Sequence, residues 1–222
     1  MIVLHHLNNS RSQRILWLLE ELGLEYKLQR YERDPVTILA PPSLKKVHPL
    51  GKSPVITEGD VTLAESGAII EYLIQTHGNG QFKPRPDSAD YWQYVFWMHY
   101  AEGSLMPPLL LRLVFEKVKE NPAPFFVKPI IGKIVKETNK RFIGPQIKTH
   151  MGYVNDYLAQ HSWLAGDALS GADFQMSFPL EAAVARGTVG AEYPNIVRYV
   201  KQFQSRPAYQ KALEVGGEYD YA

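Results

Sequence analysis

The hydrophobic pattern near the start of the chain changes period twice, and each change marks a new element. The run from Ile2 to His6 is β-branched and apolar, which predicts a strand. From Ser12 to Gly23, apolar residues recur every three or four positions, which predicts a helix. Looser alternation over residues 25–31 predicts a second strand, parallel to the first because a helix separates them. The pattern therefore indicates a right-handed βαβ unit.

The next stretch continues this α/β pattern. A Pro-rich polar segment holds a predicted short helix at about residues 36–47. Two apolar runs, at 54–57 and 61–63, flank a turn that contains glycine, which predicts a β-hairpin. Ser66 begins a helix whose apolar pattern ends near His77. The predicted order βαβαββα thus fills residues 1–78.

The remaining sequence has a different pattern. Residues 79–87 combine glycine, proline and charge, which predicts an exposed linker. Beyond it we find no strand-like alternation, and helical spacing recurs at residues 91–115, 130–159, 172–186, 195–205 and 207–215. Pro107 and Pro108 predict a kink or a break in the first of these helices. We therefore predict an all-helical domain over residues 88–222.

Composition narrows the classes of function. The chain has 222 residues, 45% of them apolar, so it can bury a sizeable core. Its 24 Lys and Arg nearly balance 23 Asp and Glu, so no global field attracts nucleic acid or an anionic membrane. Without cysteine, any thiol chemistry must come from a bound small molecule. No apolar run approaches the ~20 residues of a membrane span, and we expect a soluble cytoplasmic protein without a bound metal.

The loop between the first strand and the first helix is the first candidate for chemistry. Residues 8–12 read Asn-Asn-Ser-Arg-Ser and lie at the carboxyl end of a parallel strand, where open α/β sheets form clefts. The free amides of the following helix favour an anion there. The hydroxyl groups of Ser10 and Ser12 and the amide of Asn9 are donors suited to a thiolate or a phosphate. The alternative is structural, with Ser10 or Ser12 capping the helix.

A proline loop and a helix start form the second candidate site. Pro54 stands at the start of a predicted strand, and a cis bond there turns the backbone of Ser53 outward, where it can pair with an extended peptide. Glu65 offers a carboxylate for an ammonium group, and Ser66 offers a hydroxyl and helix amides for a carboxylate. Together they suit the amino-acid end of a ligand. The alternative is that Ser66 only caps the helix and Glu65 only complements its dipole.

Four segments then resemble one family. Residues 10–17 (SRSQRILW), 48–56 (HPLGKSPVI), 63–73 (LAESGAIIEYL) and 163–173 (WLAGDALSGAD) together look like the cytosolic glutathione S-transferases. Their order and spacing cover nearly the whole chain. The resemblance implies a thioredoxin-like N-terminal domain, an all-α C-terminal domain, a homodimer, and glutathione as the bound thiol and co-substrate, with no metal.

The same resemblance implies a role for each residue of the proline loop and the helix start. Lys52 is expected to bind the glycine carboxylate of glutathione, with His48 as a weaker candidate for the same group. The backbone of Ser53, before the cis Pro54, is expected to pair with the cysteine residue. Glu65 and Ser66 are expected to hold the γ-glutamyl end.

The group that activates the thiol follows from the same comparison. The position of the family's tyrosine is occupied by His5-His6-Leu7, so the loop resembles the serine or asparagine type. Ser10 is the first choice because a hydroxyl donates directly to sulfur, Asn9 is the second through its amide, and Ser12 is the third.

The expected function is transfer of the glutathione thiolate to a hydrophobic electrophile, with glutathione peroxidase activity as a further possibility. The electrophile site is expected on the aromatic-rich segment 91–115, with most of the aromatic side chains in the core or at a dimer contact and two or three facing the cleft. The alternative is a non-catalytic binding or scaffold module, since such domains also occur without turnover. Intact Lys52, Glu65 and Ser66 favour the enzyme.

Overall fold

The sheet of the N-terminal part has the predicted mixed topology. The computed structural model describes residues 1–35, 37 and 39–222. Four strands, β1 (Ile2–Leu7), β2 (Tyr26–Tyr31), β3 (Val55–Glu58) and β4 (Val61–Ala64), lie in the order β2-β1-β3-β4. β1 is parallel to β2 and antiparallel to β3, and β3 and β4 form the hairpin. Leu4 of β1 is fully buried at the centre of this sheet.

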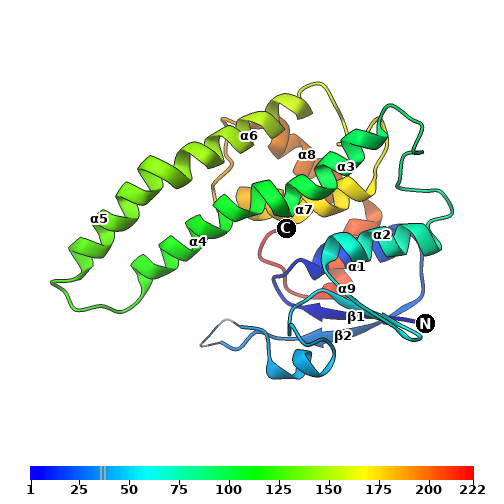
Figure 1. Cartoon of the computed structure of the whole chain (residues 1–222), viewed down its shortest axis with the longest axis horizontal. Coiled ribbons are helices and arrows are strands. Elements are labelled where there is room, and N and C mark those ends of the chain that lie inside the picture. The colour runs from blue at the N-terminus through cyan, green and yellow to red at the C-terminus, as the bar shows by residue number, and fades with distance from the viewer. Residues whose placement is uncertain (36, 38) are drawn as a thin grey trace.

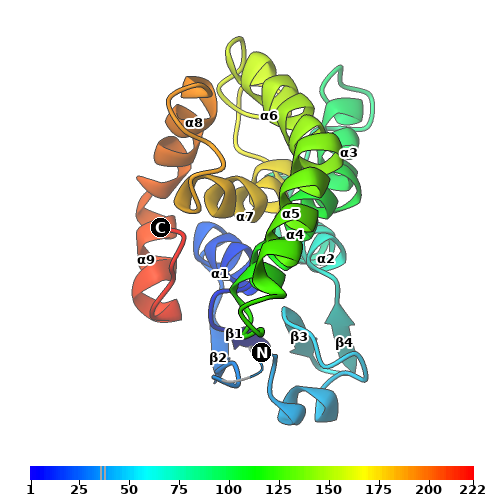
Figure 2. The ribbon, with the colours of Figure 1, turned by 90° about the vertical axis from the view of Figure 1, so that its left-hand side faces the viewer.

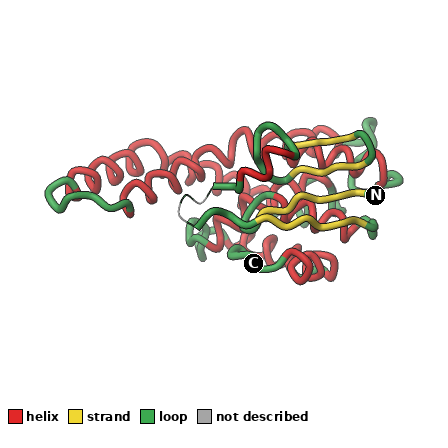
Figure 3. Tube along the Cα trace, turned by 90° about the horizontal axis from the view of Figure 1, so that it is seen from below, coloured by secondary structure: helices red, strands yellow, loops and turns green. Residues whose placement is uncertain are grey.

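Two helices cover one face of the sheet. They are α1 (Ser12–Glu21) and α2 (Ser66–His77), and the strands lie in front of the helices when the molecule is seen from below (Figure 3). The expected helix at 36–47 is shorter, a 3-10 turn over Pro42–Lys46, and residues 36 and 38 lie outside the described residues. Pro41 precedes another proline and is therefore extended, so the turn begins only at Pro42. The thioredoxin-like order of elements is otherwise confirmed.

The C-terminal part is all-helical over the described residues, as predicted. Its helices are α3 (Tyr91–Tyr100), α4 (Met106–Glu120), α5 (Lys128–Thr138), α6 (Gly144–Leu158), α7 (Gly171–Ala185), α8 (Pro194–Gln204) and α9 (Pro207–Gly216). α4 and α5 project from the body as a long helical pair (Figure 1). Within the described chain, none of the helices is both long and apolar enough to cross a membrane.

The prolines of the first long helix do not break it. A π-helical turn at Ala101–Leu105 joins α3 to α4, and a second at Asn139–Ile143 joins α5 to α6. Pro107 and Pro108 fall in the first turn of α4, directly after the first π-turn, where the helix changes its hydrogen-bond register. A missing backbone donor is tolerated in a first turn, so the helix continues.

Trp17 joins the two parts of the molecule. Its fully buried ring, on α1, lies 4.4 Å from the ring of Phe174 on α7, and 5.3 Å and 5.6 Å from those of Phe203 on α8 and Tyr209 on α9. Figure 2 shows α1 beside α7 between the sheet and the upper helices. Packing of this kind is worth about 0.5–1.5 kcal/mol per aromatic pair beyond area burial. The helical part therefore fixes the position of α1, whose first turn borders the candidate site.

Buried polar contacts fix the start of α7 as well. The Ser170 amide donates to Asp173 Oδ2 at 2.8 Å, and Asp173 Oδ1 accepts from the Leu164 amide at 3.0 Å and the Tyr199 hydroxyl at 2.6 Å. Asp173 is fully buried, so these donors replace its water shell. They hold α7 in place, and α7 carries Phe178 into the candidate site.

Candidate active site

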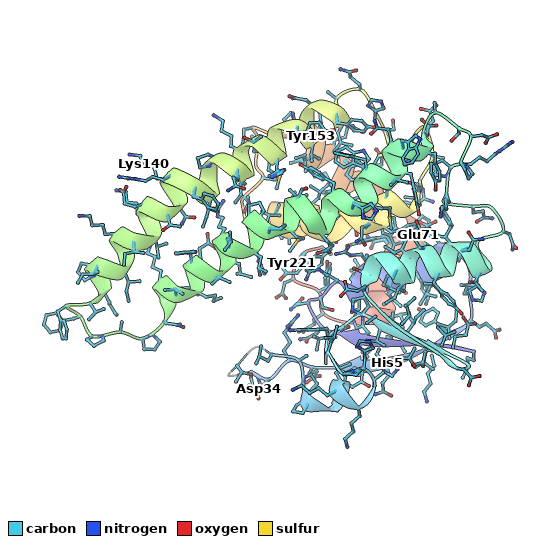
Figure 4. All side chains as sticks on the ribbon, in the orientation of Figure 1. His5, Asp34, Glu71, Lys140, Tyr153 and Tyr221 are labelled. Carbon is cyan, nitrogen blue, oxygen red and sulfur yellow. The ribbon has the colours of Figure 1, made fainter. Side chains whose placement is uncertain are left out.

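A cavity of about 620 Å³ lies between the carboxyl end of β1 and the helical part. Its polar side is formed by the loop after β1, the segment after β2 and the proline loop, with Asn9, Ser10, Arg11, Arg33, Lys52 and Ser53. Its apolar side is formed by α4 and α7, with Met106, Leu109, Leu110, Leu113, Phe178 and Ala182. The C-terminal tail closes one edge with Asp220 and Tyr221. Figure 4 shows Tyr221 between the helices and the sheet that carries His5.

Hydrogen bonds within the loop after β1 fix both of its serines. Ser10 Oγ donates to the Leu7 carbonyl at 2.8 Å, lies 2.8 Å from Ser12 Oγ, and accepts from the Ser12 amide at 3.2 Å. Ser12 Oγ turns inward to His6 Nδ1 at 2.9 Å and does not line the cavity. Ser10 therefore borders the cavity and also satisfies a free amide at the start of α1.

The side chain of Asn9 is held by Asp220 of the C-terminal tail. Its backbone lies in the left-handed region, with φ +48°, which asparagine tolerates better than most residues. Its Nδ2 donates to Asp220 Oδ2 at 2.8 Å, and its Oδ1 accepts from the Asp220 amide at 2.9 Å. The amide thus has a defined orientation at the edge of the cavity.

The proline loop places Lys52 and Ser53 on the cavity. The Ser53–Pro54 bond is cis, as expected. Ser53 Oγ donates to the His5 carbonyl at 2.9 Å and accepts from the Leu7 amide at 3.2 Å, which ties this loop to β1. Pro54 is buried behind the lining, and the ammonium group of the exposed Lys52 is free to reach an anion.

Glu65 and Ser66 stand at the start of α2, outside the lining of this cavity. Glu65 has φ +72° and ψ 113°, a conformation that non-glycine residues rarely adopt and that costs about 1–3 kcal/mol. Its side chain is exposed, whereas Ser66 is buried at the first position of the helix. His48 is also off the lining, where its Nδ1 accepts from the Leu50 amide at 3.4 Å. Of the expected site residues, the cavity therefore brings together Asn9, Ser10, Lys52 and Ser53.

The cavity has a cationic character. Among the described residues that line it, the five cationic side chains are Arg11, Arg33, Lys52, Arg112 and Arg186, and the two anionic ones are Glu116 and Asp220. Arg11 is paired with Glu102 at 2.9 Å and Arg112 with Glu116 at 2.9 Å. The balance favours an anionic ligand. Within the described part of the chain, no group of three His, Asp or Glu side chains is arranged to hold a metal ion.

The apolar wall differs from the expected aromatic one. Of the expected segment, the apolar wall takes Met106, Leu109, Leu110 and Leu113 of α4, and none of the aromatic residues of α3 lines the cavity. Trp97 is fully buried and packs 5.0 Å from Tyr157 of α6, so it fills the helical core instead. The π-turn at Ala101–Leu105 lies between the aromatic α3 and the aliphatic start of α4, and of these two helices α4 contributes to the lining.

Several lining residues had no signal in the sequence. Arg33 lies in an irregular segment after β2, and Asp220 and Tyr221 lie beyond the last helix. No periodicity connects such residues to a site, because their positions depend on how the chain folds back over the cavity. Phe178 belongs to a strongly apolar helix, and its role was indistinguishable from that of a core residue.

Comparisons with known proteins agree with this fold and cavity. Residues 1–75 match the "Glutathione S-transferase, N-terminal domain" family and residues 126–214 match the "Glutathione S-transferase, C-terminal domain" family. Glutathione S-transferase 3 of Schizosaccharomyces pombe is 39% identical, over 96% of this chain and 87% of its own length. Glutathione S-transferase 1 of Saccharomyces cerevisiae is 36% identical, over 96% and 94%.

A comparison with solved structures finds glutathione S-transferases as well. A glutathione S-transferase from Actinobacillus pleuropneumoniae superposes with a TM-score of 0.81 at 37% identity, covering 97% of this chain and 93% of its own. The fold, with a thioredoxin-like part followed by a helical part, is that of the glutathione transferase class of proteins. The sequence matches show the family. The chain belongs to the glutathione S-transferase family.

Proposed function

We propose that the protein transfers the thiolate of glutathione to hydrophobic electrophiles. The observation that carries the proposal is the cavity, which sets hydrogen-bond donors at the start of α1 opposite the aliphatic wall of α4. The names of the similar proteins support the same reaction. A thiol held by the donors and an apolar substrate held by the wall would meet in one space.

Glutathione would lie extended along the N-terminal part. Lys52 would bind the glycine carboxylate, and the backbone of Ser53 would pair with the cysteine residue. Glu65 would bind the α-ammonium group, and Ser66, at the amino end of α2, would bind the adjacent carboxylate. The strained backbone of the exposed Glu65 supports this assignment, because such strain persists where the side chain must be presented in one direction.

The loop after β1 would stabilise the thiolate. A free thiol has a pKa near 8.5, and lowering it by about two units requires roughly 2.7 kcal/mol. One charge-assisted hydrogen bond supplies about 1.5–3 kcal/mol, and a helix amino end adds about 0.3–1 kcal/mol. Ser10 would donate by turning its hydroxyl from the Leu7 carbonyl to the sulfur, whereas Asn9 keeps a second amide hydrogen beside the one given to Asp220.

Three further proposals concern the chain as a whole. We place the glutathione-binding domain at residues 1–78, the linker at 79–87 and the electrophile-binding domain at 88–222, and we place the enzyme in the cytoplasm. We also propose a homodimer. Trp92, Phe96 and Tyr153 support it, because they expose 72%, 40% and 45% of their surfaces on the neighbouring helices α3 and α6.

Calorimetry with glutathione tests the binding site directly. Glu65→Ala should weaken glutathione binding more than tenfold, because the ammonium group loses its only carboxylate in the proposed site, whereas Glu65→Gln retains a hydrogen-bond acceptor and should lose less. Asp60→Ala, an exposed acidic residue in the β3–β4 turn, is the matched control. Unchanged affinity in Glu65→Ala would contradict the assignment.

Turnover assays separate the possible reactions. Conjugation of an aryl halide supports the transferase, and reduction of a hydroperoxide by glutathione adds peroxidase activity. Tight glutathione binding without either reaction would favour the non-catalytic module instead.

A further inference from the structure

The C-terminal tail crosses the edge of the cavity at a defined position. After α9, Gly217 turns the chain at φ +88°, a conformation that favours glycine. The tail then runs back toward the centre of the molecule, where Figure 1 marks the C-terminus. The Tyr219 hydroxyl donates to Glu181 Oε2 at 3.0 Å, and Arg186 donates to the Tyr221 hydroxyl at 2.6 Å. Contacts on both sides of Asp220 therefore fix its position.

Asp220 meets Asn9 through two reciprocal hydrogen bonds. The Asn9 amide nitrogen donates to the Asp220 carboxylate at 2.8 Å, and the Asp220 backbone amide donates to the Asn9 side-chain oxygen at 2.9 Å. The two bonds require opposite ends of the same amide group, so they exclude the flipped orientation. One hydrogen of Asn9 Nδ2 then points away from the pair and remains for another acceptor.

We propose that Asp220 is a positioning residue, which orients the Asn9 amide so that its second hydrogen is donated to the sulfur of bound glutathione. The inference rests on the proposed function, in which the loop after β1 holds the thiolate. Asn9 and Asp220 are 211 positions apart in sequence, and both line the same cavity. The pair thus couples the docked tail to the site of thiol activation.

Orientation and charge predict opposite effects, which makes the proposal testable. The Asp220 carboxylate brings a negative charge near the sulfur, and by charge alone it would disfavour the thiolate. By geometry, it fixes the donor that favours the thiolate. Asp220→Asn removes the charge and keeps both a side-chain acceptor and the backbone donor. Asp220→Ala removes the charge and the acceptor.

The experiment is ultraviolet titration of the thiolate of enzyme-bound glutathione, with kcat/KM for an aryl halide measured in parallel. Asp220→Ala should raise the thiol pKa by about half to one unit and lower kcat/KM about 3- to 10-fold, with glutathione affinity unchanged. Asp220→Asn, unlike Asp220→Ala, should keep the wild-type thiol pKa and kcat/KM or lower the thiol pKa slightly. Glu218→Ala, which changes another exposed acidic residue of the tail, is the matched control and should titrate like the wild type.

Three outcomes decide the matter. A thiol pKa in Asp220→Ala equal to or below that of the wild type overturns the positioning role, as does an Asp220→Asn variant as impaired as Asp220→Ala. A wild-type enzyme that binds glutathione without lowering its thiol pKa contradicts the proposed function itself. Asp220 is exposed, so thermal unfolding of each variant is expected to match the wild type and separates these effects from misfolding.

Discussion

Arg14 on α1 and Glu102 on the π-turn form an ion pair, with 2.7 Å between Nη2 and Oε1, that joins the two parts of the molecule. Arg14 is fully buried, and its Nη1 also donates to the carbonyl and the side-chain oxygen of Gln175 on α7, both at 2.7 Å. Glu102 also pairs with Arg11, which lines the cavity. The pair therefore secures the first turn of α1, beside the proposed thiol site.

Glu102→Ala is expected to destabilise the fold by about 3 kcal/mol, because it leaves the buried Arg14 charge without its carboxylate partner. Glu102→Gln keeps an acceptor but no charge and should lose less. Urea denaturation at pH 7 measures both. A loss below about 0.5 kcal/mol in Glu102→Ala would show that the pair behaves as an exposed ion pair.

The same pair predicts a pH dependence. Burial opposes ionisation of Glu102, but Arg14 and Arg11 outweigh it and hold the pKa of Glu102 below its ordinary value of 4.5. The folded state therefore binds fewer protons, and this stabilisation is present above pH 4.5 and is lost as pH falls through the lowered pKa. The stability difference between the wild type and Glu102→Gln should narrow below pH 4.5. A constant difference across that range would contradict the assignment.

Glu181 predicts a pH dependence of the opposite sign. Burial raises its pKa to about 7, against hydrogen bonds from Tyr209, Tyr219 and Gln204 and the nearby Arg14, which favour the ionised form. The folded state keeps a proton that the unfolded state loses above pH 4.5, so this contribution to stability falls as pH rises from about 4.5 to 7.

The contribution of His6 to stability changes with pH in the opposite direction to that of Glu181, over nearly the same pH range. Burial, reinforced by Arg30, lowers the pKa of His6 from 6.5 to about 4, so its contribution to stability rises with pH over that interval. The contributions of Glu181 and His6 to stability should therefore partly cancel in the wild type. Glu181→Gln removes the contribution of Glu181, so the free energy of unfolding of this variant should rise more steeply between pH 4.5 and 6.5 than that of the wild type. Parallel profiles from denaturation at several pH values would refute the assignment to Glu181.

The sequence predicted those parts of the fold that depend on local patterns. The β-branched run from Ile2 to His6, the helix start at Ser66 and the apolar spacing of the helices were sufficient for the order of elements, because short-range periodicity decides which face is buried. The prediction that aromatic residues of α3 line the cavity was wrong, because helical spacing does not show which side of a helix faces a cavity. The π-turns were also missed, because single-residue changes of helical register leave no periodic signal.

The residues of the candidate site likewise include some that a local motif predicts and others that only the tertiary structure brings together. Ser53, Pro54 and Lys52 follow one another in sequence, so a motif identifies them together, and the cis bond was expected from that motif. Asp220 reaches Asn9 only because α9 packs against α1 and directs the tail back over the loop. Such a contact between the two ends of a chain is a property of the tertiary structure, and no local pattern predicts it.

The proposed homodimer makes a prediction about exposed aromatic residues. Trp92→Glu is expected to yield a monomer by sedimentation at concentrations where the wild type has about twice the 25.2 kDa chain mass, because a charge would be buried in the interface. Phe125→Glu is the matched control, since Phe125 is 84% exposed in the turn between α4 and α5 and lies outside the proposed interface. A monomeric wild type, or dissociation by the control alone, would contradict the proposed interface.

The activating donor can be identified by comparing Ser10→Ala with Asn9→Ala. If Ser10 holds the thiolate, Ser10→Ala should raise the thiol pKa and lower kcat/KM by roughly 10- to 100-fold, equivalent to about 1.4–2.7 kcal/mol, with little change in glutathione binding. Asn9→Ala should then titrate like the wild type. The bonds from Ser10 Oγ to the Leu7 carbonyl and Ser12 make this outcome dependent on a rotation of the hydroxyl.

If Asn9 holds the thiolate instead, the kinetic loss should appear in Asn9→Ala. Ser10→Ala should then cost only about 1 kcal/mol of stability, because its hydroxyl satisfies the Ser12 amide at the start of α1. Ultraviolet titration of the thiolate separates these cases, and denaturation of both variants separates catalysis from stability. A thiol pKa that shifts in neither variant would move the role to the backbone amides at the amino end of α1 or to Ser12.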